Sequence, residues 1–278
     1  MLPLLTLTLQ RELLTAAREG TATIDCSVDL DRSRTEVQVD AEGWVWQQRR
    51  FPHLNSCRDR TVYHWSGGSF EPVARFSGSL IKLVPTRWGA PTFEIDGIKM
   101  LPSERVSPWD DAGRKVGLIA PRGKRVLDTC GGLGYFAAWS LAGGAVLVKS
   151  FEKNSDVLWL RSFNPWSPST LSAGLELAAL ELECADVVQR IEQLPAASFD
   201  AVLHDPPRFG IAGELYSQSF YDALARVLVR GGRLFHYTGT PNRLTSGRDV
   251  PAEVAGRLQR AGFRTQRVGD GVLAERRK

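Results

Sequence analysis

The stretch Arg125–Gly134 reads RVLDTCGGLG, and it decides the fold class of the chain. Its first half is an apolar run typical of a buried parallel strand, and its second half is a glycine-rich turn that opens the apolar helix pattern of residues 135–144. Glycine permits positive φ and close approach of a ligand to the backbone, and a helix N-terminus offers N–H groups to an anion. Such turns also occur for purely structural reasons, so the turn alone leaves both interpretations open.

Strand and helix patterns alternate on both sides of this stretch as far as the C-terminus. Strands are expected at 125–130, 145–152, 180–184, 199–205 and 233–239, helices at 156–164, 186–194, 215–232 and 251–262, and a closing hairpin at 264–277. This alternation predicts an α/β fold with a parallel, doubly wound sheet, to which the hairpin adds an antiparallel edge. Short β-rich runs separated by turn residues fill 23–101, after one helix pattern. We therefore expect a smaller β-rich N-terminal domain (1–105) before the α/β domain (106–278).

Composition and charge narrow the function classes. The chain has 278 residues with 43% hydrophobic and 24% charged residues, which excludes disordered and fibrous classes. Residues 1–120 carry 15 basic and 15 acidic residues, so the net charge of +4 arises in 121–278, and 257–278 alone holds seven basic and two acidic residues. A basic edge attracts phosphates, although an arginine-rich coding bias explains it equally well.

Cysteine usage and hydropathy indicate the compartment. The four cysteines form no CxxC pair, so neither a zinc site nor a disulfide framework is expected. No apolar run approaches 18 residues, so we expect no membrane span. The chain reads as a cytoplasmic protein that needs no metal, and its oligomeric state is left open.

Acidic residues follow the first three expected strands. Glu152 stands 24 residues after Asp128, where a carboxylate can accept both hydrogen bonds of a ribose, although an exposed strand end would look the same. The pattern of Asp128, Cys130, Gly132, Gly134 and Glu152 differs from the dinucleotide G-x-G-x-x-G motif. It resembles the S-adenosylmethionine site of Rossmann-like methyltransferases, with Cys130 where many of them have the first glycine.

That resemblance gives Asp186 a role after the third strand. In such folds an acidic residue here commonly holds the adenine amino group, and the next residue, Val187, would pack against the ring. A plain helix N-cap is an equally good interpretation of Asp186.

The fourth strand ends in HDPPRF, residues 204–209. Consecutive prolines fix a rigid turn and cannot donate backbone hydrogen bonds. The Asp205 carboxylate and the Pro206 carbonyl, with Pro207 stiffening the turn, are then acceptors that can orient an exocyclic amine as a nucleophile. Asp-Pro-Pro methyltransferases usually have an aromatic residue next; here Arg208 takes that place, so stacking on a target base would come from Arg208 or from Phe209.

The whole C-terminal two-thirds then resembles one family. The strings VLDTCGGLGY (126–135), NPWS (164–167), HDPPRFGIAGELYSQSFY (204–221) and LFHYTG (234–239) are similar to those of predicted S-adenosylmethionine-dependent methyltransferases first noted in archaea. The resemblance implies a seven-stranded Rossmann-like methyltransferase sheet, cofactor contacts near Asp128, Gly132, Gly134, Glu152 and Asp186, and target contacts at 205–209. It also implies RNA as partner, with cytidine N4 of ribosomal RNA as the leading target.

For four other polar residues a purely structural role is the favoured interpretation. Arg114 or Lys115 could pair with a cofactor carboxylate, but a solvated helix face is favoured for both. His204 and His236 lie in apolar strands and are expected to be core histidines whose ring nitrogens are hydrogen-bonded, with a proton relay as the alternative.

These observations predict methyl transfer from S-adenosylmethionine to an exocyclic amine of RNA. Two alternatives remain at this stage: an enzyme like the polyamine aminopropyltransferases, which place a small β domain before a Rossmann-like domain, and a noncatalytic RNA-binding module that keeps the fold. The Asp-Pro-Pro-Arg turn argues against the first.

Overall fold

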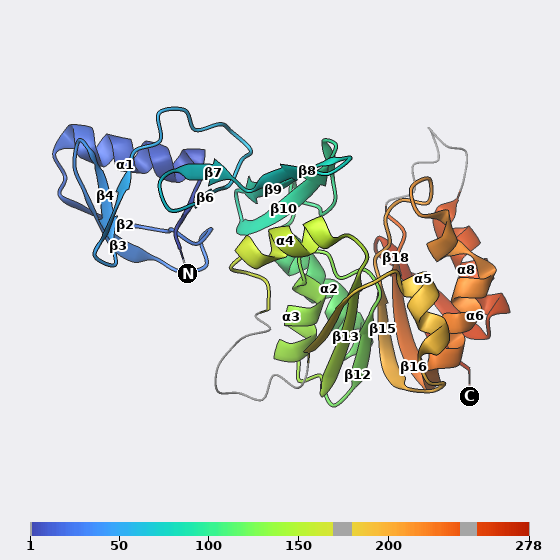
Figure 1. Ribbon diagram of the computed structural model, residues 1–278. Coiled ribbons are helices and arrows are strands. Elements are labelled where there is room, and N and C mark those ends of the chain that lie inside the picture. The colour runs from blue at the N-terminus through green and yellow to red at the C-terminus, as the bar shows by residue number, and fades with distance from the viewer. Residues whose placement is uncertain (1, 169–179, 240–248, 278) are drawn as a thin grey trace. The chain divides into compact units, whose positions relative to one another are not determined.

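A computed structural model describes residues 2–168, 180–239 and 249–277, and its chain divides into two compact units (Figure 1). The first unit comprises residues 1–111 and 159–167, and the second comprises 112–158 and 168–278. Helices α2 (Pro108–Ile119) and α4 (Ser155–Phe163) each cross from one unit into the other. The return of 159–167 to the first unit is indicated by no sequence pattern.

Three small antiparallel sheets and one helix build the first unit. Helix α1 (Leu7–Glu19) begins at Thr6, whose side chain accepts from the Leu9 N–H, and ends at Gly20 in the left-handed conformation. The sheets have the orders β1-β6-β7, β2-β3-β4-β5 and β11-β10-β9-β8. Their strands are β1 (Leu4–Leu5), β2 (Thr23–Cys26), β3 (Thr35–Val39), β4 (Gly43–Trp46), β5 (Arg49–Pro52), β6 (Tyr63–Trp65), β7 (Phe70–Pro72), β8 (Ala74–Phe76), β9 (Leu80–Thr86), β10 (Gly89–Ile95) and β11 (Ile98–Lys99).

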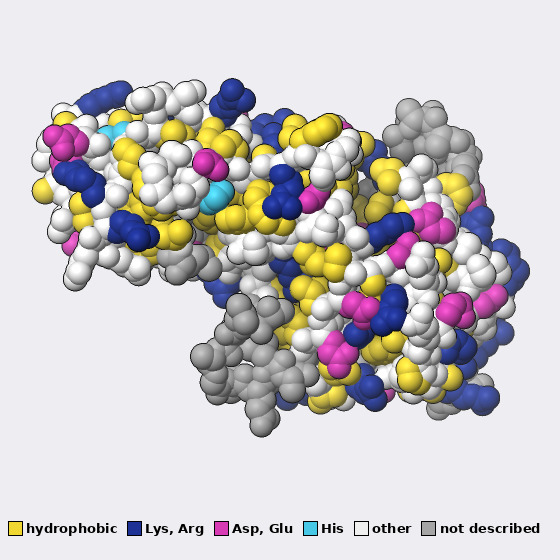
Figure 2. Space-filling view, in the orientation of Figure 1, with side chains coloured by type: hydrophobic (Ala, Val, Ile, Leu, Met, Phe, Trp, Pro, Cys, Tyr) yellow, Lys and Arg dark blue, Asp and Glu magenta, His cyan; other side chains and the backbone are white. Residues whose placement is uncertain are grey.

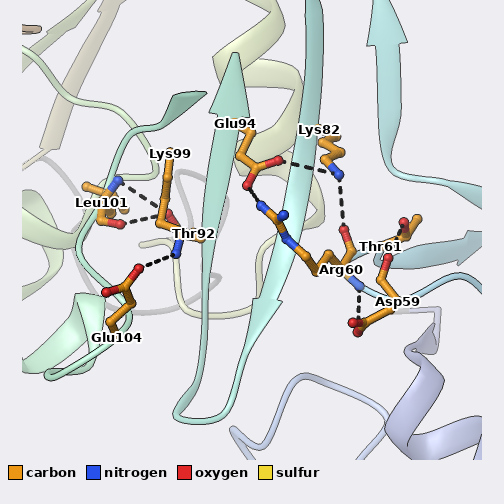
Figure 3. Close-up of polar contacts among 9 residues, drawn as sticks. All are labelled: Asp59, Arg60, Thr61, Lys82, Thr92, Glu94, Lys99, Leu101 and Glu104. Atoms are coloured by element: carbon orange, nitrogen blue, oxygen red, sulfur yellow. Dashed lines mark hydrogen bonds and ion pairs between the residues drawn. The ribbon is translucent and has the colours of Figure 1, made fainter. Parts of the chain in front are cut away.

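Aromatic stacking and one buried carboxylate stabilise this unit. Trp44 is fully buried and stacks on Phe51 with ring centroids 4.6 Å apart. Glu94 on β10 is also buried, and it is paired with Arg60 and with Lys82, whose Nζ lies 3.4 Å from Oε2 (Figure 3). These two cations offset the cost of burying the negative charge of Glu94 in a region of low dielectric constant.

The second unit contains a seven-stranded sheet of order β14-β13-β12-β15-β16-β18-β17. The strands are β12 (Arg125–Asp128), β13 (Leu147–Glu152), β14 (Leu180–Cys184), β15 (Phe199–His204), β16 (Leu228–Tyr237), β17 (Phe263–Val268) and β18 (Gly271–Arg276). The first five are parallel, and β18 runs antiparallel to both of its neighbours. The predicted fold class, a Rossmann-like seven-stranded sheet with a smaller β-rich N-terminal part, is confirmed.

Helices cover both faces of this sheet (Figure 1). Helix α3 (Tyr135–Ala142) lies on one face, and α5 (Val187–Arg190), α6 (Gln218–Val227) and α8 (Val250–Arg260) lie on the other. Short 3-10 turns follow α5 (Ile191–Gln193) and precede α6 (Gly213–Tyr216). None of the helices in the described ranges is long and apolar enough to cross a membrane.

One detail of the predicted elements is wrong. The helix expected over 215–232 ends at Val227, because Leu228 already pairs with Phe199 in the ladder between β15 and β16. The closing hairpin adds the antiparallel edge that the sequence predicts, and its second strand β18 lies between β16 and β17. Apolar residues at Val272 and Ala274 are fully buried there, which favours the central position for β18.

Candidate active site

The ends of four neighbouring parallel strands bring the predicted acidic residues to one edge of the sheet. Asp128 is the last residue of β12, Glu152 is the last of β13, Asp205 follows β15, and Asp186 lies two residues after β14. In the ladders Asp128 stands opposite Ser150 and Leu203. The carboxyl edge of an open α/β sheet is where such folds bind ligands.

The glycine-rich turn folds as a tight loop between β12 and α3. Gly132 and Gly134 have φ of +49° and +84°, a region that side-chain-bearing residues rarely adopt, and Gly134 is the N-cap of α3. The Gly134 N–H donates to the Gly131 carbonyl at 2.7 Å. Below the loop, the buried Asp128 carboxylate accepts from the Ser150 hydroxyl at 2.8 Å.

Cys130 lies inside this loop as a neutral thiol. Burial, reinforced by the nearby Glu152 carboxylate, raises the pKa of Cys130 well above its ordinary value. The thiolate is the nucleophilic form of cysteine, so this environment disfavours nucleophilic chemistry at Cys130. Cys130, which the sequence predicts to contact the cofactor, is therefore poorly suited to act as a nucleophile.

Glu152 is held against the loop by backbone donors. Its Oε2 accepts from the Gly132 N–H at 2.9 Å, and its Oε1 accepts from the Asn154 N–H at 2.8 Å. A carboxylate offers about four lone-pair sites, so it can accept more than these two hydrogen bonds. The two backbone bonds thus fix the orientation of this strand-end carboxylate.

Asp186 is an N-cap in the structure. Its Oδ1 accepts from the Val188 N–H at 2.9 Å at the start of α5, and its Oδ2 lies 2.8 Å from Lys153 Nζ. Val187 beside it is buried in the apolar cluster beneath α5 and α6. The capping interpretation is confirmed, whereas contact with an adenine amino group stays a prediction.

The Asp-Pro-Pro turn leaves β15 at the same edge. Pro206 is buried, Pro207 and Arg208 are exposed, and the Pro207 carbonyl accepts from the Tyr216 hydroxyl at 3.0 Å. Within the described residues no hydrogen bond reaches the Pro206 carbonyl. Phe209 is half-buried and packs edge-to-face on Tyr216, with ring centroids 5.4 Å apart.

Sequence reasoning missed one residue of this site. Lys115 on α2 is only 1% exposed, contrary to the expected solvated helix face, and its Nζ lies 3.4 Å from Asp205 Oδ2. The same ammonium lies 3.8 Å from the centre of the Tyr237 ring, which adds a cation–π contact. By contrast, Arg114 is exposed and pairs with Asp270 at 2.8 Å.

A signal for Lys115 was present in the helix periodicity. Ala112, Val116 and Ile119 are all buried, and Lys115 falls on the stripe that these positions define. A lysine on an apolar stripe needs an anionic partner, which here comes from a turn 90 residues away. The buried Lys115 places a positive charge directly beside the candidate catalytic carboxylate.

The two strand histidines are sealed in the core, as predicted. His204 Nδ1 lies 2.7 Å from the Thr129 hydroxyl and Nε2 lies 3.1 Å from the Leu215 carbonyl. His236 Nδ1 contacts the Tyr237 carbonyl at 2.8 Å and Nε2 contacts the Tyr221 hydroxyl at 2.9 Å. With both nitrogens of each ring engaged inside the protein, neither ring is set up as a proton relay.

Burial of these histidines predicts acid sensitivity. Desolvation lowers the pKa of His236 from 6.5 to about 4, so the unfolded state binds a proton that the folded state refuses. The contribution of this ring to the free energy of unfolding is therefore complete above about pH 6.5. It is lost progressively as the pH drops toward 4, by up to about 3 kcal/mol. We expect the urea midpoint to fall between pH 7.5 and 5 at constant m-value, and the variant His236→Asn to show a smaller fall between the same two pH values. Equal pH dependence in the two proteins would contradict this origin.

The chain is similar in sequence to two known proteins. It is 39% identical over 217 residues to the protein named Uncharacterized protein MJ1233 of Methanocaldococcus jannaschii, and the match covers 77% of this chain and 73% of that protein. The chain belongs to the MJ1233 family. A segment of 64 residues is 38% identical to Polyamine aminopropyltransferase 2 of Streptomyces coelicolor, covering 22% of this chain and 12% of that protein. No protein-family model matches the chain.

Solved structures share the fold of this MJ1233-family chain. A spermidine synthase in complex with the transition-state analogue AdoDATO matches with a TM-score of 0.57 and 16% identity, over 73% of this chain and 72% of that one. The spermidine synthase of Thermotoga maritima matches with a TM-score of 0.55 and 17% identity, over 73% and 71%. At this level of identity the likeness establishes the fold of the MJ1233-family chain and leaves its chemistry to the site residues.

Proposed function

We propose that this protein is an S-adenosylmethionine-dependent N-methyltransferase that acts on an exocyclic amine of RNA, with cytidine N4 in ribosomal RNA as the leading target. One observation carries the proposal: two fixed acceptors, the Asp205 carboxylate and the Pro206 carbonyl, stand at the carboxyl edge of the sheet next to the glycine loop. A planar amine with two N–H donors matches such a pair of acceptors. Enzymes gain rate by fixing a nucleophile in this way.

The chain's residues fit S-adenosylmethionine at this edge. Glu152 would accept from the ribose hydroxyls, the Gly132–Gly134 loop allows close approach of the ligand to the protein backbone, and Asp186 would meet the adenine amino group. When bound, the cofactor supplies an activated methyl group. The fold likeness to enzymes named spermidine synthase, one of them in complex with AdoDATO, supports the same choice of ligand class.

The protein's own groups then perform the orientation. Asp205 and the Pro206 carbonyl would each accept one N–H of the amine, which leaves the nitrogen lone pair directed away from them. The Lys115 ammonium at 3.4 Å stabilises the ionised, acceptor-only form of the Asp205 carboxylate. This carboxylate also stabilises the positive charge that the nitrogen gains on alkylation, and it can accept the released proton.

A second candidate, aminopropyl transfer to a polyamine, draws support from the segment similar to Polyamine aminopropyltransferase 2. An acceptor such as putrescine is a cation, and the buried Lys115 ammonium beside Asp205 opposes its approach. Incubation with putrescine and decarboxylated S-adenosylmethionine separates the two functions. Formation of spermidine at enzymatic rates would replace our proposal by the second candidate.

Nucleoside mass spectrometry tests the proposed function directly. RNA from a strain that lacks the gene is compared with RNA from the same strain carrying either the wild-type chain or the Asp205→Asn variant. We expect one methylated cytidine to disappear on deletion, to return with the wild-type chain and to stay absent with the variant. An unchanged set of methylated nucleosides would refute RNA as the substrate.

A further inference from the structure

The amino edge of the seven-stranded sheet holds a cavity that the proposed chemistry does not use. It is a hollow of about 450 Å³ that is open to solvent. Four arginines line it, Arg226, Arg230, Arg276 and Arg277, and we call it the arginine cavity. Asp222 is the one acidic residue among the described residues that line it, and its carboxylate accepts from Gln218 Nε2 at 2.9 Å.

Two of these arginines are fixed to the backbone and form the wall of the cavity. Arg226 donates to the carbonyls of Leu194 and Ile191 at 2.7 and 2.6 Å, and Arg276 donates to the Leu228 carbonyl. Carbonyls do not neutralise a guanidinium, so both residues keep their full positive charge. Neither guanidinium forms an ion pair within the part of the chain that the structure describes, so the wall carries two positive charges.

The other two arginines are available to a ligand. Arg230 and Arg277 are exposed, and neither side chain makes a hydrogen bond or ion pair within the ranges 2–168, 180–239 and 249–277. Figure 2 shows Lys and Arg side chains gathered along the edge of the molecule where α6, α8 and the C-terminus lie. Planar guanidinium groups of this kind bind phosphate oxygens in a bidentate manner.

A bulge in β16 positions Arg230. Leu228 pairs with Phe199, but the next ladder pair joins Ala201 to Arg233, so the residues between Leu228 and Arg233 leave the ladder. A Cβ at Gly232 would lie 2.8 Å from the Val229 carbonyl oxygen and 3.0 Å from the Asp200 carbonyl oxygen, so the bulge needs a glycine there. The bulge is thus a defined feature of the strand, and Arg230 within it is exposed and lines the cavity.

The arginine cavity lies far from the candidate catalytic carboxylate. Strand β16 begins at the cavity with Leu228 and ends at Tyr237, whose ring contacts Lys115 beside Asp205. Its regular part from Arg233 to Tyr237 alone spans about 13 Å at the usual rise per residue. A single nucleotide cannot occupy both places, whereas a polynucleotide can.

We propose that the arginine cavity binds a backbone phosphate of the same RNA whose amine is held at Asp205. This inference rests on the proposed function, because it takes the substrate to be RNA. The exposed side chains of Arg230 and Arg277 contact the phosphate, and Arg226 and Arg276 supply the positive charge behind them. The site selects RNA long enough to cross the sheet over free nucleosides or nucleotides.

The test compares two double variants of equal charge. Arg230→Gln/Arg277→Gln alters the cavity, and Arg122→Gln/Arg125→Gln removes two exposed arginines of the same unit outside it. Binding of a labelled 20-nucleotide oligocytidylate is titrated at several KCl concentrations. We expect the cavity variant to bind about tenfold more weakly at low salt, with a plot of log K against log[KCl] shallower by about 1.4 for two lost phosphate contacts. The control pair is expected to keep the wild-type slope.

Three results would overturn the inference: no binding of the oligonucleotide by the wild-type protein, equal slopes in the two double variants, or tight binding of pyrophosphate that only the cavity variant loses. The last result would assign the cavity to a small phosphate ligand. Nucleoside mass spectrometry tests the proposed function independently of this binding experiment. A slope change without a methylated product leaves the cavity intact and rejects the methyltransferase, and the reverse pattern rejects the cavity alone.

Discussion

Replacing Asp205 with Asn is expected to lower kcat for methyl transfer by about 10²- to 10³-fold, the loss usual for one group that stabilises developing charge. The substitution keeps the size of the side chain and one carbonyl oxygen. It removes the negative charge that faces both the amine and the Lys115 ammonium, which lies 3.4 Å from Oδ2. The amide also presents an N–H₂ group where an acceptor is needed, so the amine loses its alignment.

Binding of S-adenosylmethionine should change little in this variant, because its proposed contacts come from the ends of β12, β13 and β14. We expect the dissociation constant measured by calorimetry to stay within about threefold of wild type, so that the loss is one of transition-state stabilisation. Asp200→Asn is the matched control. Asp200 is an aspartate on the same strand at the opposite edge, where its carboxylate accepts from the Arg125 N–H at 2.9 Å. Full activity of Asp205→Asn would show that orientation of the amine depends on other groups.

The carboxyl edge of the sheet could be predicted because parallel strands end together. Each acidic residue was placed at the end of an apolar run, and the alternation of strands and helices requires those ends to meet on one edge. Glu152 and Asp205 therefore fall where the sequence placed them, on β13 and after β15. No knowledge of long-range packing was needed for this step.

Lys115 shows how far local reasoning reaches: the periodicity of α2 indicates that it is buried, but not which anion it meets. A lysine near a helix surface is normally solvated, and the helix itself gives no hint of an anion from β15. Only the fold brings the Asp205 carboxylate over α2, and that contact makes burial of the ammonium tolerable. The predicted end of α6 is wrong for a related reason. Leu228 suits a helix or a strand, and its pairing with Phe199 places it in β16.

Replacing Glu152 with Ala is expected to weaken binding of S-adenosylmethionine by at least about 10²-fold. Two hydrogen bonds from ribose hydroxyls to a carboxylate would be lost, each contributing about 1.5–3 kcal/mol. The variant also frees the Gly132 and Asn154 N–H groups that the carboxylate now accepts at 2.9 and 2.8 Å, so the glycine loop loses its support. Calorimetric titration of the purified full chain measures the effect.

Glu152→Gln separates the two contributions. The glutamine oxygen can still accept from the Gly132 N–H, whereas its N–H₂ group replaces the oxygen that accepts from Asn154. The glycine loop thus keeps its own support while the charge is removed. We expect this variant to bind S-adenosylmethionine at least about tenfold more weakly than wild type, because hydrogen bonds to ionised acceptors are about twice as strong as neutral ones. Glu181→Gln on the neighbouring β14, where the carboxylate is exposed and lies 3.3 Å from Lys149 Nζ, serves as a control and should bind normally. Wild-type affinity in both Glu152 variants would exclude this carboxylate from the cofactor site, and wild-type affinity in Glu152→Gln alone would assign it to loop support.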